Sequence, residues 1–130
     1  MTLKISDRQY PLSVMTPFTF ADLTSGVAAP IVELPPGAVV TGGMLVIETA
    51  FDSATSDTLI VGDAGGPDRY VAGVDGQATG ATALVPTGYL TPSTTDITLT
   101  WTGVGAAPTQ GAGYLIVTYI REDRSQENQG

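Results

Sequence analysis

The chain has 130 residues, of which 42% are hydrophobic and 14% charged, and its formal net charge at pH 7 is −8. This length fits one ordinary domain, and a chain this rich in hydrophobic residues is not expected to be disordered. Between Gln9 and Ile120 the sequence has nine acidic residues and one basic residue, Arg69. This excess of negative charge repels the phosphates of nucleic acids and the headgroups of anionic lipids. We therefore expect neither nucleic acid nor a membrane as a partner.

Cysteine and histidine are both missing from the sequence. Disulfides, thiolate nucleophiles, imidazole bases and the usual zinc sites are therefore excluded. A serine nucleophile would have only Lys4 as a lysine base. We expect that the protein is not an enzyme and has no catalytic residues, no cofactor and no metal. The start of the chain lacks the continuous apolar stretch of a secretory signal, so we expect no export.

The first predicted elements are short apolar stretches at residues 10–14 and 18–20, and a helical turn is predicted over residues 20–26. We interpret residues 1–17 as an N-terminal arm. It is either an edge strand with a frayed tip or an extended segment that pairs with another chain. In the second case its contacts would be Tyr10, Leu12, Val14, Phe18 and Phe20.

Strands are predicted next over residues 30–34 and 42–51. In the longer strand the alternation of polarity places Glu48 on the outer face. The residues expected on its inner face are Leu45, Ile47 and Phe51. The Gly42-Gly43 pair predicts a bulge or a sharp bend, because glycine within a strand marks such irregularities.

Three short strands are predicted around the glycine-rich segment GDAGGPDRYVAGVDGQATG, at residues 57–62, 69–74 and 81–85. The glycines indicate turns and not a phosphate loop, because the Gly-Lys-Ser/Thr ending is missing. The DAGGPD stretch predicts the turn between the first two strands. Asp75-Gly76 predicts a tight hairpin into the third.

Arg69 begins the second of these strands, and it is the one base in an acidic body. A single guanidinium in such surroundings is usually paired with a carboxylate. We expect an ion pair with Asp63 or Asp68 of the same chain. The functional alternative is a contact of Arg69 across a subunit boundary.

The last two strands are the clearest. A strand is predicted over residues 95–102, where residues 97–102 alternate strictly between apolar residues and threonine, which is typical of a half-buried strand. Residues 113–120 are apolar on both faces, which predicts a central or interface strand. Its contact residues would be Tyr114, Ile116 and Ile120. The remaining residues, 122–130, form a polar tail with nothing to bury.

Glycine and proline recur at short intervals and leave no stretch that reads well as a long helix. The pattern predicts an all-β chain, an antiparallel β-sandwich or jelly roll of about eight strands, with an open barrel as the alternative. We place the domain at residues 18–121, between the arm of residues 1–17 and the tail of residues 122–130.

Three kinds of ligand site can be weighed against plain structural roles. The loop aspartates lack the D-x-D spacing of calcium loops, so we do not assign a metal to them. Glu33 and Glu48 are the glutamates of the body and could form a carboxylate pair on neighbouring strands. Five aromatic residues could line a sugar platform, although strand aromatics usually pack in the core. These are Tyr70, Tyr89, Trp101, Tyr114 and Tyr119.

Several stretches resemble one family, and together they cover most of residues 32–123. They are LPPGAVVTGG, AFDSATSDTLIVGD and the AG-x-L-x-V-x-Y pattern of AGYLIVTY. The chain resembles small virion proteins of tailed bacteriophages, of the capsid decoration or cement type. The resemblance implies a β-rich homotrimer on the outside of the head, at local threefold points, where it clamps subunits of the major capsid protein. It implies no catalytic residues.

The same resemblance implies a protein made in the host cytoplasm and located on the capsid surface of the virion. Two other functions fit the residues. A tail or fibre component would have a similar composition. A monomeric carbohydrate-binding β-sandwich would use Trp101 or the tyrosines beside the loop aspartates.

Overall fold

The computed structural model describes residues 11–121 and contains eight β-strands and one 3-10 turn within them. The strands are β1 (Leu12–Thr19), β2 (Ala28–Leu34), β3 (Ala38–Thr49), β4 (Ser56–Asp63), β5 (Gly66–Asp75), β6 (Gly80–Ala83), β7 (Thr95–Val104) and β8 (Ala112–Arg121). The 3-10 turn η1 covers Phe20–Asp22. No helix in the described part of the chain is long and apolar enough to cross a membrane.

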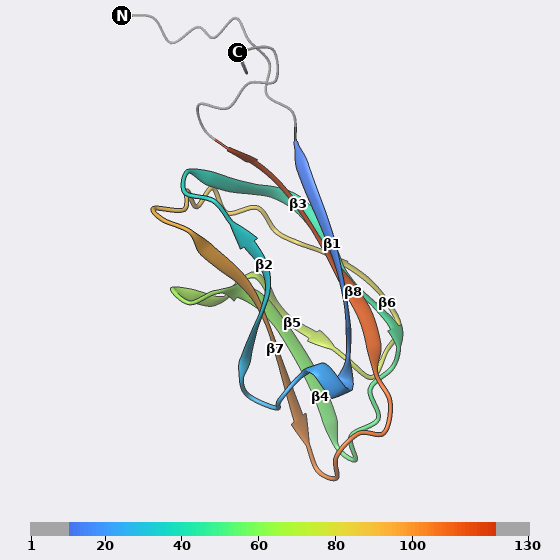
Figure 1. Ribbon diagram of the computed structural model, residues 1–130. Helices are drawn as coiled ribbons and strands as arrows, with labels where there is room; N and C mark the ends of the chain where they lie inside the picture. Colours follow the sequence, from blue (N-terminus) through green and yellow to red (C-terminus); the bar gives the residue numbers. More distant parts are fainter. Residues whose placement is uncertain (1–10, 122–130) are drawn as a thin grey trace, which may run out of the picture.

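The strands form two antiparallel sheets that pack face to face (Figure 1). One sheet has the order β1-β8-β3-β6 and the other has the order β2-β7-β4-β5. Four antiparallel pairs join strands from opposite ends of the chain: β1 with β8, β2 with β7, β3 with β6 and β4 with β5. Successive pairs alternate between the two sheets. This is the strand order of a jelly roll, so the predicted all-β fold is confirmed in that form.

Alternation along the strands fills the space between the sheets. In β8 the side chains of Leu115 and Val117 are fully buried, while their neighbours on the other face of the strand are half-buried. Leu45 of β3 and Leu99 of β7 are fully buried in the same cluster. Burying a leucine side chain contributes about 2 kcal/mol, so this cluster supplies much of the stability.

Each strand predicted from residue 30 onward overlaps an observed one. Residues 10–14 and 18–20 were expected as separate stretches, but the described part of both belongs largely to the single strand β1. The predicted helical turn is the 3-10 turn η1. Asp22 caps the start of this turn, because its carboxylate accepts hydrogen bonds from the backbone N–H and the hydroxyl of Thr19. The predicted bulge is confirmed, since the register of β3 against β8 shifts between Val40 and Gly42.

The predicted hairpin at Asp75-Gly76 is wrong. β5 lies in one sheet, and β6 pairs with β3 in the other. Gly76 is held by backbone hydrogen bonds, donating to Asp57 O and accepting from Phe51 N, both at 2.8 Å. These bonds tie the chain to the end of the sandwich as it crosses between the sheets. Local turn chemistry does not reveal such a crossing, because the same residues suit either path.

The N-terminal arm was expected over residues 1–17. Within it, Leu12 and the residues that follow pair with β8 of the same chain, from Leu12↔Tyr119 onward. These residues are therefore an edge strand of the sandwich, which was one of the two interpretations. The other arm residues up to Tyr10 and the tail of residues 122–130 lie outside the described residues.

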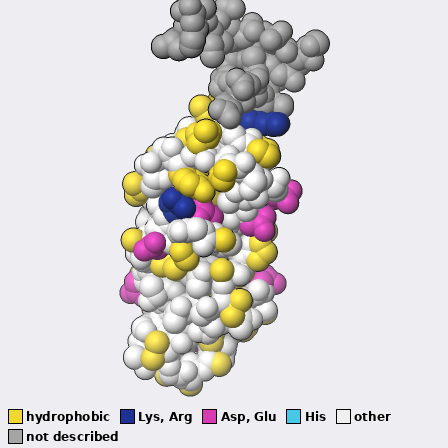
Figure 2. All heavy atoms as spheres, turned by 90° about the vertical axis from the view of Figure 1, so that its left-hand side faces the viewer, with side chains coloured by type: hydrophobic (Ala, Val, Ile, Leu, Met, Phe, Trp, Pro, Cys, Tyr) yellow, Lys and Arg dark blue, Asp and Glu magenta, His cyan; other side chains and the backbone are white. Residues whose placement is uncertain are grey.

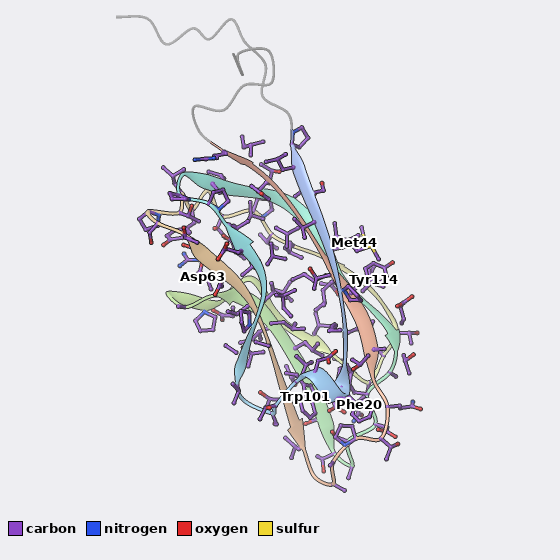
Figure 3. The ribbon with its side chains drawn as sticks, in the orientation of Figure 1. Phe20, Met44, Asp63, Trp101 and Tyr114 are labelled. Atoms are coloured by element: carbon purple, nitrogen blue, oxygen red, sulfur yellow. The ribbon has the colours of Figure 1, made fainter. Side chains whose placement is uncertain are left out.

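A buried polar network closes one end of the core around Asp57. Its carboxylate accepts hydrogen bonds from Trp101 Nε1 at 2.7 Å, Ser53 Oγ at 2.6 Å and Gln77 Nε2 at 2.9 Å. The ring of Trp101 also stacks on Phe51, with centroids 5.7 Å apart. Figure 3 shows Trp101 near this end of the sandwich. The network joins β4 to β7 and to the loop after β5.

Candidate interaction surface

The outer face of the β1-β8-β3-β6 sheet carries an apolar band that crosses all of its strands. One row runs in register from Met15 through Ile116 and Met44 to Ala83, and the next runs from Pro17 through Tyr114 and Val46 to Ala81. We call these eight residues the apolar band. Met15 is 59% exposed and Met44 40% exposed. In Figure 3, Met44 and Tyr114 lie on the side of this sheet that faces away from the other sheet.

The band contains no charged residue, although the described chain has nine acids and two bases. Glu48 lies beyond it, near the end of β3, and is exposed. The outer face of the other sheet differs, because Glu33 of β2 and Asp96 of β7 are exposed cross-strand partners there. Figure 2 shows acidic side chains spread over the side of the molecule where that sheet lies. The apolar band is therefore uncharged, whereas the outer face of the other sheet carries paired carboxylates.

Contacts between the sheets cover parts of the strand edges. At one side Thr16 Oγ1 of β1 donates to Ile31 O of β2 at 3.5 Å. At the other side the backbone N–H of Val85, just after β6, donates to Tyr70 O of β5 at 3.0 Å. Pro30 in β2 also lacks an N–H to offer. A partner strand would find these edges partly occupied.

Some of the residues predicted as contacts lie on the outer surface, and others lie in or against the core. Tyr114, Ile116 and Ile120 lie half-buried on the outer face of β8, where a partner can reach them. Phe18 is 3% exposed and belongs to the core, so its prediction as a contact is wrong. Leu12, Val14 and Phe20 are half-buried, and the last two pack against the core. Tyr10 lies outside the described residues.

Six residues of the band were not predicted as contacts from the sequence: Met15, Pro17, Met44, Val46, Ala81 and Ala83. In β1 the residues expected at the contact surface were Leu12, Val14 and Phe18, whereas alternation with Phe18 inside places Met15 and Pro17 outside. For β3 the sequence already indicated the outward residues. Leu45 and Ile47 were expected inside, so their neighbours Met44 and Val46 must face outward.

Arg69 pairs within its own chain. Its guanidinium donates from Nε to Asp63 Oδ2 at 2.8 Å and from Nη2 to Asp63 Oδ1 at 3.1 Å. Asp63 also accepts from the backbone N–H groups of Gly65 and Gly66, and its side chain is 2% exposed. The guanidinium lies 3.7 Å from the centroid of the Tyr89 ring. The predicted intrachain ion pair is confirmed with Asp63. The hydrogen bonds that Arg69 donates to the Asp63 carboxylate raise the pKa of Arg69.

Replacing Arg69 by methionine is expected to lower the free energy of unfolding by about 2 kcal/mol. The buried Asp63 carboxylate would keep its two backbone donors but lose its counter-ion. The loss is smaller than for a fully buried pair because Arg69 remains 21% exposed. Urea denaturation measures it, with Arg121→Met at the exposed end of β8 as the control. Equal midpoints for the two variants would contradict the structural role of the pair.

The aromatic residues do not form a sugar platform. Tyr70 and Trp101 are buried, and Tyr114 lies on the outer face of the other sheet from Trp101. Tyr89 lines a shallow hollow of about 540 Å³ together with Pro30, Asp96 and several hydroxyl residues. One aromatic ring is thus available there, and the guanidinium of Arg69 already contacts it.

The acidic residues serve separate local roles. Glu33 and Glu48 belong to different sheets, so the suggested carboxylate pair is wrong. Asp52 accepts hydrogen bonds from Thr109, first from its hydroxyl, and these lower the pKa of Asp52. Asp75 accepts from the backbone N–H of Gln77. Among the described residues no group of three or more acids is arranged to hold a metal ion.

No protein-family model and no curated protein sequence matches this chain. Among the solved structures that share its fold are three phage capsids. A chain of the cyanophage Pam1 capsid asymmetric unit is 24% identical, with a TM-score of 0.68, and the match covers 93% of this chain and 91% of that one. A chain of the Ralstonia phage GP4 capsid is 17% identical, with a TM-score of 0.67, over 95% and 92% of the two chains.

A chain from the acidic stable capsid of the Helicobacter pylori bacteriophage KHP30 is 18% identical, with a TM-score of 0.64. That match covers 87% of this chain and 93% of the other. At these identities the likeness concerns the fold. Since the coverage is high in both directions, the capsid chains are close in length to this one, and the whole jelly roll recurs as a chain of its own.

Proposed function

We propose that this protein is a structural protein of a tailed-phage virion that decorates the outside of the head and stabilises it. The observation that carries the proposal is the match of nearly the whole chain to chains of similar length in three phage capsid structures. The resemblance of the LPPGAVVTGG and AFDSATSDTLIVGD stretches to small phage virion proteins supports the same role.

The chemistry of the chain supports a binding role. The sequence has no histidine or cysteine, and the glutamates of its body are on separate sheets. A surface feature that could bind a partner is the uncharged apolar band, which a rigid β-sandwich supports from behind. A decoration protein needs no more than this, because many copies with modest contacts together hold a shell against internal pressure.

The partners in this proposal are the major capsid protein and further copies of this chain, arranged as a homotrimer at local threefold points. The protein is made in the host cytoplasm and ends on the capsid surface. Electron microscopy of purified particles tests this location directly. Density for the jelly roll on the outside of the head supports the proposal, whereas density on the tail or fibres, or none on the particle, overturns it.

Heads that lack the protein are expected to release their DNA at a lower temperature than complete heads. The reason is that each bound copy adds contacts that intact heads keep and burst heads lose. DNA release measured by dye fluorescence during heating reports the difference. Adding purified protein back is expected to restore the higher temperature, and bovine serum albumin at equal concentration serves as the control. Identical release curves with and without the protein would contradict a stabilising role.

A further inference from the structure

We infer that the shallow hollow on the outer face of β2 and β7 binds an arginine side chain in a basic segment of a partner protein. The inference goes beyond the proposed function, because it concerns the other sheet from the apolar band and does not depend on what the band contacts. In Figure 3, Asp63, which lines the hollow, and Met44 of the band lie on opposite sides of the molecule.

The hollow has a floor and walls from separate parts of the chain. Asp96 and Thr98 of β7 form the floor, because alternation along the strand turns the residues between and beyond them into the core. Pro30 of β2 lies on one side, and the turn between β4 and β5 lies on the other. Tyr89 and the segment that leads into β7 complete the lining. The volume of about 540 Å³ is within the range of ligand pockets.

Two carboxylates at the hollow have no counter-ion among the described residues. Glu33 is the cross-strand partner of Asp96, and both are exposed on this face. Carboxylates at opposed positions of paired strands repel each other. The bases of the described chain do not relieve this repulsion, since Arg69 is paired with Asp63 and Arg121 belongs to β8 in the other sheet. The charge that this face favours in a ligand is therefore positive.

An unpaired hydroxyl in the floor independently indicates a ligand. Thr98 is 8% exposed, and its Oγ1 has no hydrogen-bond partner in the described part of the chain. A buried hydroxyl without a partner is unfavourable. Rotation about χ1 exchanges the positions of the methyl and hydroxyl groups of Thr98, so the hydroxyl can turn into the hollow and accept from an N–H group there.

An arginine side chain matches these features together. Opposed side chains on paired strands have Cβ atoms about 5 Å apart, so one planar guanidinium can donate to both Glu33 and Asp96. It has further N–H groups for Thr98. The ring of Tyr89 already packs against one guanidinium, that of Arg69, at 3.7 Å from its centroid. A calcium ion fits less well, because no group of three or more acids within residues 11–121 is arranged to hold a metal.

The inference is tested with a blocked Gly-Arg-Gly-Arg-Gly peptide and with the same peptide carrying uncharged citrulline in place of arginine. Isothermal titration calorimetry at low ionic strength measures binding to the full chain. We expect the arginine peptide to bind, more weakly as salt is added, and the citrulline peptide not to bind at the same concentrations. Asp96→Asn should weaken binding about fivefold, as expected for one exposed ion pair. Glu48→Gln, which removes an exposed carboxylate from the other sheet, should leave it unchanged.

Thr98→Val separates a role in binding from a role in the fold. It keeps the shape of the side chain and removes the hydroxyl, which has no partner to lose in the folded chain. We expect a urea midpoint no lower than that of wild type, and binding of the arginine peptide weakened about fivefold by the loss of one hydrogen bond. Unchanged binding by Thr98→Val would overturn the inference.

Three further results would also overturn it: no binding of the arginine peptide, equal binding of the citrulline peptide, or equal weakening by Asp96→Asn and Glu48→Gln. The same measurements identify other occupants. A signal on titration with calcium alone that Asp96→Asn abolishes would assign the hollow to a metal ion. Tighter peptide binding by a variant with Lys4→Gln and Arg8→Gln would assign it to basic residues of this chain. Either result would overturn the inference.

Discussion

Asp57→Asn is expected to lower the free energy of unfolding by about 3 kcal/mol at neutral pH. The carboxylate is 1% exposed and accepts hydrogen bonds from Trp101, Ser53 and Gln77. An asparagine amide would turn its own N–H₂ group toward at least one of these donors, leaving a buried donor without an acceptor. Urea denaturation followed by tryptophan fluorescence measures the loss, since Trp101 is the only tryptophan.

The effect of Asp57→Asn is also expected to depend on pH. Burial by itself raises the pKa of Asp57, but the hydrogen bonds, from the Ser53 hydroxyl first, outweigh it and the pKa is lowered. A carboxyl whose pKa is lower in the folded state adds stability above its unfolded pKa of about 4. That stability is lost as the pH falls through the folded pKa. The difference between wild type and Asp57→Asn should therefore shrink below about pH 4.

Asp68→Asn is the control for this experiment, because Asp68 is exposed at the start of β5. It removes the same charge and is expected to leave the urea midpoint unchanged. If Asp57→Asn is as stable as Asp68→Asn at neutral pH, the hydrogen-bond network does not hold the end of the sandwich.

Gly43→Ala is expected to lower the free energy of unfolding by about 4 kcal/mol. Gly43 has φ of 132°, a conformation that residues with a Cβ rarely adopt. A Cβ at this position would also run into the backbone carbonyl of Ile116 in the paired strand β8. Since Ile116 O belongs to a fixed strand, the two strands would have to separate. Thermal unfolding by circular dichroism measures the effect.

The neighbouring Gly42→Ala is a closely matched control. It makes the same chemical change one residue earlier in β3, but its φ is not positive and a Cβ there meets no atom within 4 Å. We expect a melting temperature close to that of wild type. A Gly42→Ala protein destabilised as much as Gly43→Ala would show that the bulge itself, and not the contact with β8, requires glycine.

Both predictions concern the rigidity behind the apolar band. Gly43 lies in β3 next to Met44 and keeps β3 close to β8, so that the rows of the band stay in register. Asp57 joins the loop after β5 to β4 and β7 on the other sheet. A binding surface benefits from such a backbone, because less conformational freedom is lost on association.

The strands themselves could be predicted from the sequence, for a local reason. Period-2 alternation in residues 97–102 and the punctuation by glycine and proline are short-range signals that do not depend on the partner strand. The Gly42-Gly43 bulge and the pairing of Arg69 with a nearby acid belong to the same class. In both cases the deciding residues lie within a few positions of each other.

The amino-acid sequence was sufficient for the all-β class, the inward residues of the clearest strands and the absence of histidine and cysteine chemistry. The folded chain was needed to learn which strands pair, that the chain crosses between sheets after Asp75, and that Glu33 and Glu48 lie on different sheets. It was also needed to place Met15 and Met44 in one row. The physical reason is that a strand's own pattern names its two faces, whereas the register with distant strands decides which residues meet on them.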